Sequence, residues 1–307
     1  MTTTQILDIA YIRLGASDLD ATSEFLNKFG LTTQRYDTTL YGRGTNGNPY
    51  CLISEAGSPG LKAVGFEVAS RDDLERLSSL DDGSGITAVD APGGGELVRF
   101  TDPNGYTVEA IYGWQRDSAV PPDARPPVNS GELRTRIQKP VRLEPLPSRV
   151  KRLGHCVLHV KDFRESEAWY KSRFGFLTSD EIHTDSPERA MGAFMRCNRG
   201  ETPVDHHTLF LLQTPGEGLQ HAAFEVHDWD DLMVGHDVLT QAGYQHQWGI
   251  GKHVLGSQVF DYWRDPDGHT LEHFTDGDLF DASYPPGSAS LESIRRVQWG
   301  AQMPAAQ

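Results

Sequence analysis

The hydrophobic and polar positions of the chain fall into four segments that share one order of elements. Each segment opens with an apolar run typical of a strand, passes an acidic residue and enters a stretch with the apolar spacing of a helix. Short runs rich in β-branched and aromatic residues follow each helix and have the length of strands. We therefore expect each half of the chain to contain two strand–helix–three-strand units.

Clear end signals bound the first and third of the expected helices. Asp18 precedes the first helix, which stops at Gly30, since glycine accepts the left-handed backbone of a helix end. Asp162 and Glu165 have the spacing of a capping box, and Gly175 is the matching stop of the third helix. The sequence therefore predicts where two of the four helices begin and end.

The chain has 307 residues, which is long enough for two domains with real cores. We expect an α+β protein with an N-terminal domain over residues 1–113 and a C-terminal domain over residues 151–280. Residues 114–150 are rich in Pro, Arg and Ser, which is typical of a linker. Residues 281–307 contain YPPG and predict a tail that is partly ordered by packing on the domain or on a neighbour.

The two halves of the chain repeat one another in sequence. Three pairs of stretches match: 10–18 with 154–162, 61–73 with 219–231, and 102–109 with 265–272. Three residues of the second half, all of types that bind metals, have these counterparts in the first: Tyr11 for His155, Ala63 for His221, and Glu109 for Glu272. Both histidines are therefore absent from the first half.

His155, His221 and Glu272 together have the composition of a metal site. Two neutral imidazoles and one carboxylate on separate strands form a facial triad that leaves coordination positions open. We therefore predict these three residues as metal ligands in the C-terminal domain, and a duplicated scaffold without a complete site in the N-terminal domain. The alternative is that they are polar core residues of a decayed repeat, but burying them without a metal would leave polar groups to satisfy.

Strand alternation separates the triad from most other histidines. Glu272 and His273 must point to opposite faces of a strand, and only one of His206 and His207 can face the site. His159 lies about 13 Å along the strand from His155, which is too far for a shared ion. We interpret His159, His227 and His273 as residues that do not bind the metal. Three others fall in polar, surface-like stretches: His183, His236 and His246.

Net charge and cysteine content narrow the classes of partner and compartment. The formal net charge is −15 and the basic residues form no long run, so nucleic acid and anionic membrane are poor candidates as partners. The three cysteines have no CxxC spacing, which argues against a disulfide framework and favours a reducing compartment. We find no signal peptide and no apolar stretch long enough to span a bilayer, and we expect a cytoplasmic protein.

Residues 249–278, GIGKHVLGSQVFDYWRDPDGHTLEHFTDGD, resemble the signature of the type I extradiol ring-cleaving dioxygenases of the vicinal oxygen chelate superfamily. In that signature a histidine, a tyrosine and the metal glutamate follow at fixed intervals. They match His253, Tyr262 and Glu272 of this chain. A pocket-lining aromatic is the alternative interpretation of Tyr262, and an exposed histidine of a Gly-rich loop is the alternative for His253.

The resemblance extends over nearly the whole chain. His155 and His221 match the two ligand histidines of the family, and residues 205–212, DHHTLFLL, resemble the segment that contributes its acid–base histidine. His207 matches that histidine, for which a cross-strand polar residue is the alternative interpretation. The family is also a two-domain duplication with its metal in the second domain, built from four βαβββ modules.

The resemblance implies a catechol substrate, dioxygen, and Fe(II) or less often Mn(II), with extradiol ring cleavage to a muconic-semialdehyde-type product in aromatic catabolism. It also implies a homo-oligomer. Val157 should face the pocket and no Arg lies beside His253, so we expect an alkyl or aryl ring substituent. Two alternatives stay open: a glyoxalase-like isomerase or epimerase, for which Glu109 is the only obvious extra carboxylate, and a non-catalytic small-molecule-binding protein.

Overall fold

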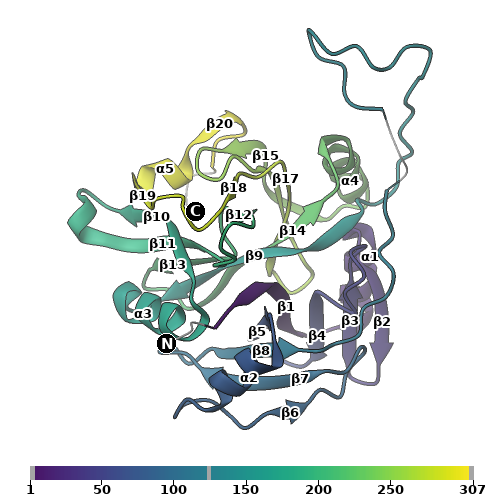
Figure 1. The fold of residues 1–307 in the computed structure, drawn as a ribbon. Coiled ribbons are helices and arrows are strands. Elements are labelled where there is room, and N and C mark those ends of the chain that lie inside the picture. The colour runs from purple at the N-terminus through teal and green to yellow at the C-terminus, as the bar shows by residue number, and fades with distance from the viewer. Residues whose placement is uncertain (1–3, 123–125, 304–307) are drawn as a thin grey trace.

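The computed structural model describes residues 4–122 and 126–303, and nearly all of their strands belong to two large sheets. The first sheet has eight strands, in the order β2-β3-β4-β1-β5-β8-β7-β6. The second has ten, in the order β19-β10-β11-β13-β9-β14-β17-β16-β15-β20. Figure 1 shows that the helices lie on the outer sides of the two sheets and that the sheets meet where β1 and β9 run past one another.

The N-terminal half contains two successive βαβββ modules. Their elements are β1 (Ile6–Ala16), α1 (Leu19–Phe29), β2 (Thr32–Tyr36), β3 (Thr39–Arg43) and β4 (Leu52–Ala56), then β5 (Gly60–Val68), α2 (Arg71–Ser78), β6 (Thr87–Ala88), β7 (Glu96–Thr101) and β8 (Thr107–Tyr112). Antiparallel pairing of β1 with β5 joins the two modules at the centre of the sheet.

The C-terminal half repeats this order with small insertions. Its elements are β9 (Val150–Val160), α3 (Phe163–Phe174), β10 (Leu177–His183), the short 3-10 helix η1 (Pro187–Arg189), β11 (Ala190–Arg196), β12 (Val204–Asp205) and β13 (Leu209–Gln213), then β14 (Gly218–Val226), α4 (Trp229–Gln241), β15 (Gln245–His253), β16 (Val259–Arg264) and β17 (Thr270–Thr275). β9 and β14 pair antiparallel at the centre. The predicted α+β architecture of four βαβββ modules is therefore confirmed.

The predicted helix ends are confirmed for α1 and α3. The Asp18 carboxylate accepts hydrogen bonds from the first turn of α1, and Gly30 ends that helix with a φ of 107°. In α3 the Asp162 carboxylate accepts from the backbone N–H of Glu165, and Gly175 ends the helix with a φ of 68°. The helices thereby satisfy backbone groups that their own hydrogen bonds leave free.

The tail of the chain connects the two edges of the ten-stranded sheet. β18 (Leu279–Phe280) pairs with β12, and β19 (Gly287–Ser290) then adds to β10 at one edge. After α5 (Leu291–Arg295), β20 (Val297–Gly300) adds to β15 at the opposite edge. Figure 1 shows this yellow segment crossing the open end of the sheet. The expected ordering of the tail is seen over residues 281–303, and the last four residues lie outside the described part.

The two halves share one hydrophobic core. Phe66 of the first half packs against Phe174 and Phe176 of the second, with ring centroids 5.6 Å and 5.3 Å apart. Between the halves, the described residues over 114–149 contain no helix or strand, and Figure 1 shows them leaving the body as a long loop. We propose the divisions at 1–113, 114–150, 151–280 and 281–307 on this basis. None of the described helices is long and apolar enough to span a bilayer.

Candidate metal centre

His155 and Glu272 lie in one row across three neighbouring strands. Ala223 on β14 is paired with His155 on β9 at one side and with Glu272 on β17 at the other. Residues in register on adjacent strands point to the same face, so the histidine and the glutamate project together on either side of a small methyl group. The row follows from strand pairing alone.

His221 faces the same side as this row by ordinary strand alternation, because it lies two residues before Ala223 on β14 and the pairing with β9 is regular between them. The register between β14 and β9 shifts just before it, between Leu219 and His221. The same shift occurs between Arg13 and Leu14 in the first half, so the bulge belongs to the duplicated scaffold. Nδ1 of His221 contacts the Gln220 side-chain oxygen, which leaves Nε2 as the free ligand atom.

The three predicted ligands converge on a single point. Nε2 of His221 lies 3.1 Å from Oε2 of Glu272 and 3.3 Å from Nε2 of His155, and the third separation, between His155 and Glu272, is 3.4 Å. Atoms at such separations can all bond one ion at about 2.0–2.2 Å. Among the described residues, neither carboxylate oxygen of Glu272 has a hydrogen-bond partner. A fully buried carboxylate without hydrogen bonds fits a metal ligand.

The N-terminal half shows how the same carboxylate is satisfied without a metal. Glu109 accepts a hydrogen bond from the Tyr11 hydroxyl at 2.6 Å, from Arg99 at 2.7 Å and from Arg13 at 3.2 Å. Gly65 replaces Ala223 in the row, and an added Cβ there would lie 2.5 Å from the Tyr11 ring. Two arginines and a tyrosine therefore neutralise Glu109.

The counterparts of those two arginines are uncharged in the C-terminal half. Strand register aligns Arg99 with Tyr262 and Arg13 with Val157. Burial alone would raise the pKa of the Glu272 carboxyl, but the imidazoles of His155 and His221 hold that pKa well below its ordinary value. Glu272 is therefore ionised, and the positive charge that it requires is not supplied by any arginine of the site.

Tyr262 and His253 lie directly beside the triad. Tyr262 pairs with Glu272 across β16 and β17, as the sequence predicts, and its hydroxyl lies 3.1 Å from Nε2 of His253. That nitrogen lies 3.7 Å from Oε1 of Glu272. The expectation that His253 belongs to a loop is wrong, because it is the last residue of β15. Burial, reinforced by the negative charge of Glu272, raises the pKa of Tyr262 well above its ordinary value.

His207 packs against the triad from the segment that precedes β13. Its ring centroid lies 4.0 Å from that of His155, and burial, with smaller effects from His155 and His206, holds its pKa well below the ordinary value. Only His207 of the pair contacts the triad, and His206 lies behind it, next to Asp180. Nδ1 of His206 lies 3.0 Å from Nδ1 of His207, and its Nε2 lies 2.7 Å from a carboxylate oxygen of Asp180. This Asp180–His206–His207 chain was not anticipated.

Three other histidines lie away from the triad, in two different settings. His273 points to the opposite face from Glu272 and hydrogen-bonds the backbone oxygen of Phe29 at 2.7 Å. The expectation that His236 and His246 are surface residues is only partly right. Both are partly exposed, and each has a ring nitrogen within 3.0 Å of the fully buried carboxylate of Asp261.

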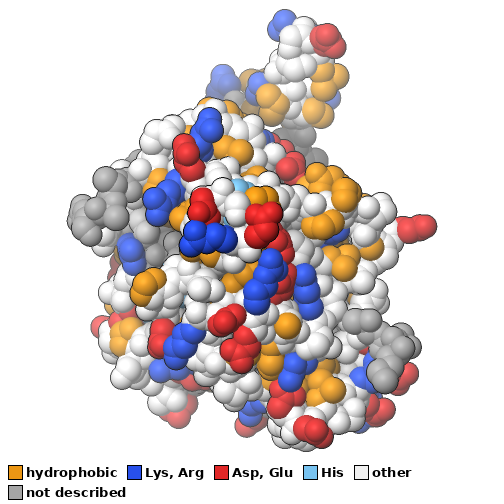
Figure 2. Space-filling model, turned by 90° about the vertical axis from the view of Figure 1, so that its left-hand side faces the viewer, with side chains coloured by type: hydrophobic (Ala, Val, Ile, Leu, Met, Phe, Trp, Pro, Cys, Tyr) orange, Lys and Arg blue, Asp and Glu red, His pale blue; other side chains and the backbone are white. Residues whose placement is uncertain are grey.

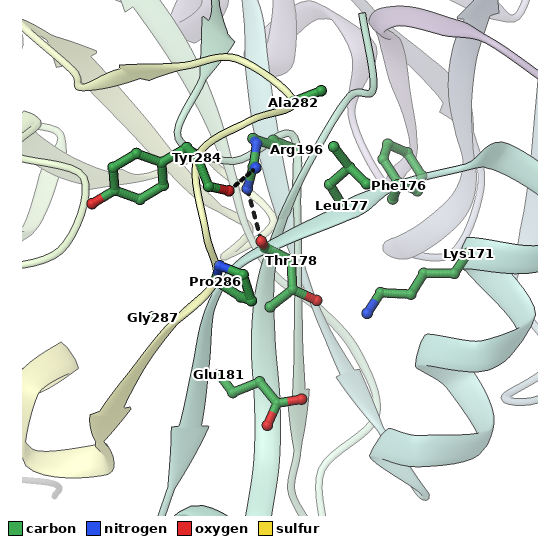
Figure 3. Close-up of a pocket in the computed structure, with 10 residues that line it drawn as sticks. All are labelled: Lys171, Phe176, Leu177, Thr178, Glu181, Arg196, Ala282, Tyr284, Pro286 and Gly287. Carbon is green, nitrogen blue, oxygen red and sulfur yellow. Dashed lines mark hydrogen bonds between the residues drawn. The ribbon is translucent and has the colours of Figure 1, made fainter. Parts of the chain in front are cut away.

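A pocket of about 580 Å³ lies elsewhere, between α3, β10 and the tail (Figure 3). Its lining includes none of the six residues predicted for the site. Arg196 is its most buried charge, but the guanidinium donates to the backbone oxygens of Thr178 and Tyr284, both at 2.7 Å. Lys171 and Glu181 have ion-pair partners of their own. These charged groups already have protein partners and do not require a ligand.

A known protein family corresponds to the half of the chain that carries the triad. The sequence profile of the Glyoxalase/Bleomycin resistance protein/Dioxygenase superfamily matches residues 152–273. These residues form a domain of that superfamily. The match begins just before His155 and ends just after Glu272, so it encloses the whole triad.

Named relatives cover most of the chain. It is 29% identical over 300 residues to Metapyrocatechase 2 of Cupriavidus necator, with 96% of this chain and 89% of that protein covered. It is 24% identical to an iron-dependent extradiol dioxygenase of Rhodococcus jostii, with 89% and 90% covered. The resemblance to extradiol dioxygenases that the motifs indicate is thereby confirmed.

A solved structure supports the fold over the full length. The Mn(II)-bound glyoxalase from Novosphingobium aromaticivorans superposes with a TM-score of 0.79 at 21% identity. The superposition covers 99% of this chain and 96% of that one. The two-domain vicinal oxygen chelate fold is therefore confirmed.

Proposed function

We propose that this protein is an extradiol dioxygenase that cleaves the ring of a catechol with dioxygen. The observation that carries the proposal is the convergence of His155, His221 and Glu272, whose buried carboxylate has no hydrogen-bond partner within the described part of the chain. The relatives named as metapyrocatechase and extradiol dioxygenase support the same reaction class. The product would be of the muconic-semialdehyde type.

The three residues would bind Fe(II), or Mn(II), through two imidazole nitrogens and one carboxylate oxygen. The named relatives include an iron-dependent enzyme, and the structural neighbour is Mn(II)-bound. A divalent ion with this donor set keeps open positions for both hydroxyl oxygens of a catechol and for dioxygen, and it supplies the redox step. The site carries a net charge of about +1 when loaded, which a singly deprotonated catechol would cancel.

Tyr262 and His253 would position the catechol oxygens. Because burial and Glu272 keep the Tyr262 phenol protonated, its hydroxyl can donate a hydrogen bond to a deprotonated substrate oxygen. His253, 3.1 Å away, can hold that hydroxyl in place or contact the second oxygen. Together they distinguish a diol from a monophenol, since a missing oxygen would leave a buried donor unpaired.

His207 would move a proton during ring opening, and its neighbours determine its tautomer. The Asp180 carboxylate can only accept, so Nε2 of His206 donates to it and Nδ1 of His206 accepts. Nδ1 of His207 must then donate to His206, which leaves Nε2 of His207 as the free base. Its lowered pKa keeps that nitrogen unprotonated at neutral pH, ready to take a proton from the substrate.

An apolar wall beside His207 supports an alkyl or aryl ring substituent. Phe194 lies 4.8 Å from the His207 ring and stacks on Phe210, with ring centroids 3.9 Å apart. Val157 belongs to the same cluster, and Leu291 and Ile294 of the tail pack against it. The side chains of this cluster are apolar and offer no charge to pair with a carboxylate arm. Turnover of dihydroxybenzoates much faster than of alkyl- or aryl-catechols would contradict this part of the proposal.

The direct test is anaerobic loading with Fe(II), followed by a catechol and then air. We expect oxygen uptake and a yellow product with the wild type. The His207→Ala variant should bind iron normally but turn over about 10²–10⁴ times more slowly. Unchanged activity in Glu272→Ala, or an iron-loaded wild type that consumes no oxygen with any catechol, would refute the proposal.

A glyoxalase-like isomerase is the second candidate, favoured by the structural neighbour. That chemistry calls for an additional carboxylate or amide ligand. Glu109 is the only obvious extra carboxylate in the sequence. Glu109 is instead bonded to Tyr11, Arg13 and Arg99 in the other half. Isomerisation of a hemithioacetal without oxygen consumption by the Mn(II)-loaded protein would favour this candidate.

We further propose a cytoplasmic homo-oligomer that binds neither nucleic acid nor membrane. Cys51, Cys156 and Cys197 are free and buried, which suits a reducing compartment. Figure 2 shows acidic and basic side chains interspersed on the visible face. The linker exposes apolar side chains that a second copy would cover: Val120, Val128, Leu133, Ile137, Leu143 and Leu146. Light scattering that gives a monomer mass at micromolar concentration would rule out the oligomer.

A further inference from the structure

A second cluster of metal-ligating side chains lies outside the triad. His236 comes from α4, His246 from β15 and Asp261 from β16. Nδ1 of His236 lies 3.0 Å from one carboxylate oxygen of Asp261, and Nε2 of His246 lies 2.8 Å from the other. One ligand atom from each of the three lies within 4.8 Å of the others. We propose that this cluster is a second metal site, which binds a divalent first-row ion such as Zn²⁺.

The buried carboxylate is the unusual feature of this cluster. Strand register aligns Asp261 with Val98 of the first half, and both side chains are 0% exposed. Burying an unpaired carboxylate in the place of a core valine costs several kcal/mol, because the ion loses its hydration. The second half therefore carries a charge at a position that the first half fills with an apolar group.

The groups around Asp261 have the arrangement of a metal site and its supporting shell. The imidazole nitrogens lie at hydrogen-bond distance from the two carboxylate oxygens, so an ion bound among the three groups would replace these hydrogen bonds. Trp263 donates its indole N–H to Oδ2 of Asp261 at 2.6 Å, which fixes the carboxylate in orientation. The His236 and His246 rings meet edge to face, with centroids 5.0 Å apart. Two imidazoles and one carboxylate are donors that zinc accepts, with a water as fourth ligand.

Access and position distinguish this cluster from the triad. The His236 and His246 side chains are 25% and 32% exposed, so an ion can reach them directly from solvent. Asp261 precedes Tyr262 and points to the opposite face of β16, under α4. An ion here would link α4 to the β15–β16 hairpin, which carries His253 and Tyr262. We therefore assign this ion a structural role. Metal analysis should find up to two ions per chain.

The test uses the full chain with the charged ligand of the triad removed, so that tight binding reports on the second site. Chelator-treated Glu272→Gln protein is dialysed against micromolar Zn²⁺ at neutral pH, and bound zinc is measured by elemental analysis. We expect one Zn²⁺ per chain, with affinity reduced about 100-fold or more when His246→Gln is added. His183→Gln in the same background is the control and should keep the ion.

Two further measurements keep the test decisive. Co²⁺ added to Glu272→Gln should give visible absorption bands that Asp261→Asn abolishes, with circular dichroism showing that both proteins are folded. His246→Gln alone should keep the ring-cleaving activity of the wild type, since it leaves the triad intact. Absence of zinc and cobalt binding in Glu272→Gln, or one ion retained after His246→Gln, would overturn the second site whatever reaction the triad catalyses.

Discussion

The duplicated carboxylates allow a matched pair of substitutions, Glu272→Gln and Glu109→Gln. Both remove one buried negative charge from equivalent positions. Glu272 has no hydrogen-bond partner among the described residues and loses only its contacts with the His155 and His221 imidazoles, so the metal-free variant should unfold within a few degrees of the metal-free wild type. It should lose metal binding and activity, and with them the stabilisation that a ligand gives, about 2.7 kcal/mol at a hundred times its Kd.

Glu109→Gln should have the opposite profile. Hydrogen bonds to a charged group contribute about 1.5–3 kcal/mol each, but Arg13 and Arg99 are 24% and 51% exposed and regain water when released. We therefore expect a loss of about 2 kcal/mol, or roughly 4–8 °C in Tm at 2–4 °C per kcal/mol. Iron content and kcat should stay at wild-type levels.

Three assays compare the two variants: thermal unfolding with and without Fe(II), iron analysis, and oxygen uptake. The reasoning fails if Glu272→Gln still gains stability from iron, because the carboxylate would then not be a ligand. It also fails if Glu109→Gln loses iron while it keeps its fold. A Glu109→Gln protein as stable as the wild type would show that the arginine contacts are worth little.

Three further outcomes are expected. His206→Ala should lower kcat about 10–100-fold with little change in KM, since it removes the group that orients His207. A kcat equal to that of the wild type would refute the role of the Asp180–His206–His207 chain. Ile294→Asp should lower kcat/KM about tenfold or more for an aryl-catechol but less than about twofold for catechol itself, and equal losses would place the substituent elsewhere. In metal-free protein, hydrogen bonding to Asp261 raises the pKa of His236, so this pair stabilises the fold below about pH 6.5 and less as pH rises through the raised pKa. His236→Gln should therefore lower Tm more near pH 6 than near pH 9 in pH-dependent unfolding, and a pH-independent loss would contradict the pairing.

The triad could be predicted because its geometry depends on strand register within a repeat. Once residues 154–162, 219–231 and 265–272 are aligned with their counterparts, pairing through Ala223 brings His155 and Glu272 into one row. No long-range information is needed beyond the order of the strands. The helix caps at Asp18 and Asp162 are predictable for a similar reason, since their signals are local.

Contacts between distant segments could not be read from the sequence. Asp180 lies 26 residues from His206, and nothing near either residue indicates that they meet. The tail shows the same limit, since its pairing with β10 and β15 depends on which sheet edges remain open. Ile294 therefore reaches the wall beside His207 without any local signal.

The error at His253 has a definite physical cause. Glycines usually weaken strands, so GIGKHVLG suggests a loop. In the structure Gly251 lies inside β15, where an added Cβ would meet the Phe260 ring at 2.7 Å. The glycine is needed for close packing of an aromatic side chain, and β15 continues to His253. A signal for the Asp261 cluster was available: an aspartate beside an inward-facing Tyr262 must point outward, under a helix, and needs partners there.

The two halves show that one buried carboxylate can be neutralised in two mutually exclusive ways. Around Glu109 the compensating charge comes from arginines, which would repel a dication at that point. Around Glu272 the same strand positions carry Val157 and Tyr262, and we propose that an ion supplies the compensating charge. Adding histidines to the first half would therefore not create a metal site while Arg13 and Arg99 remain. The absence of arginines is therefore as much a part of the proposed metal centre as the presence of the ligands.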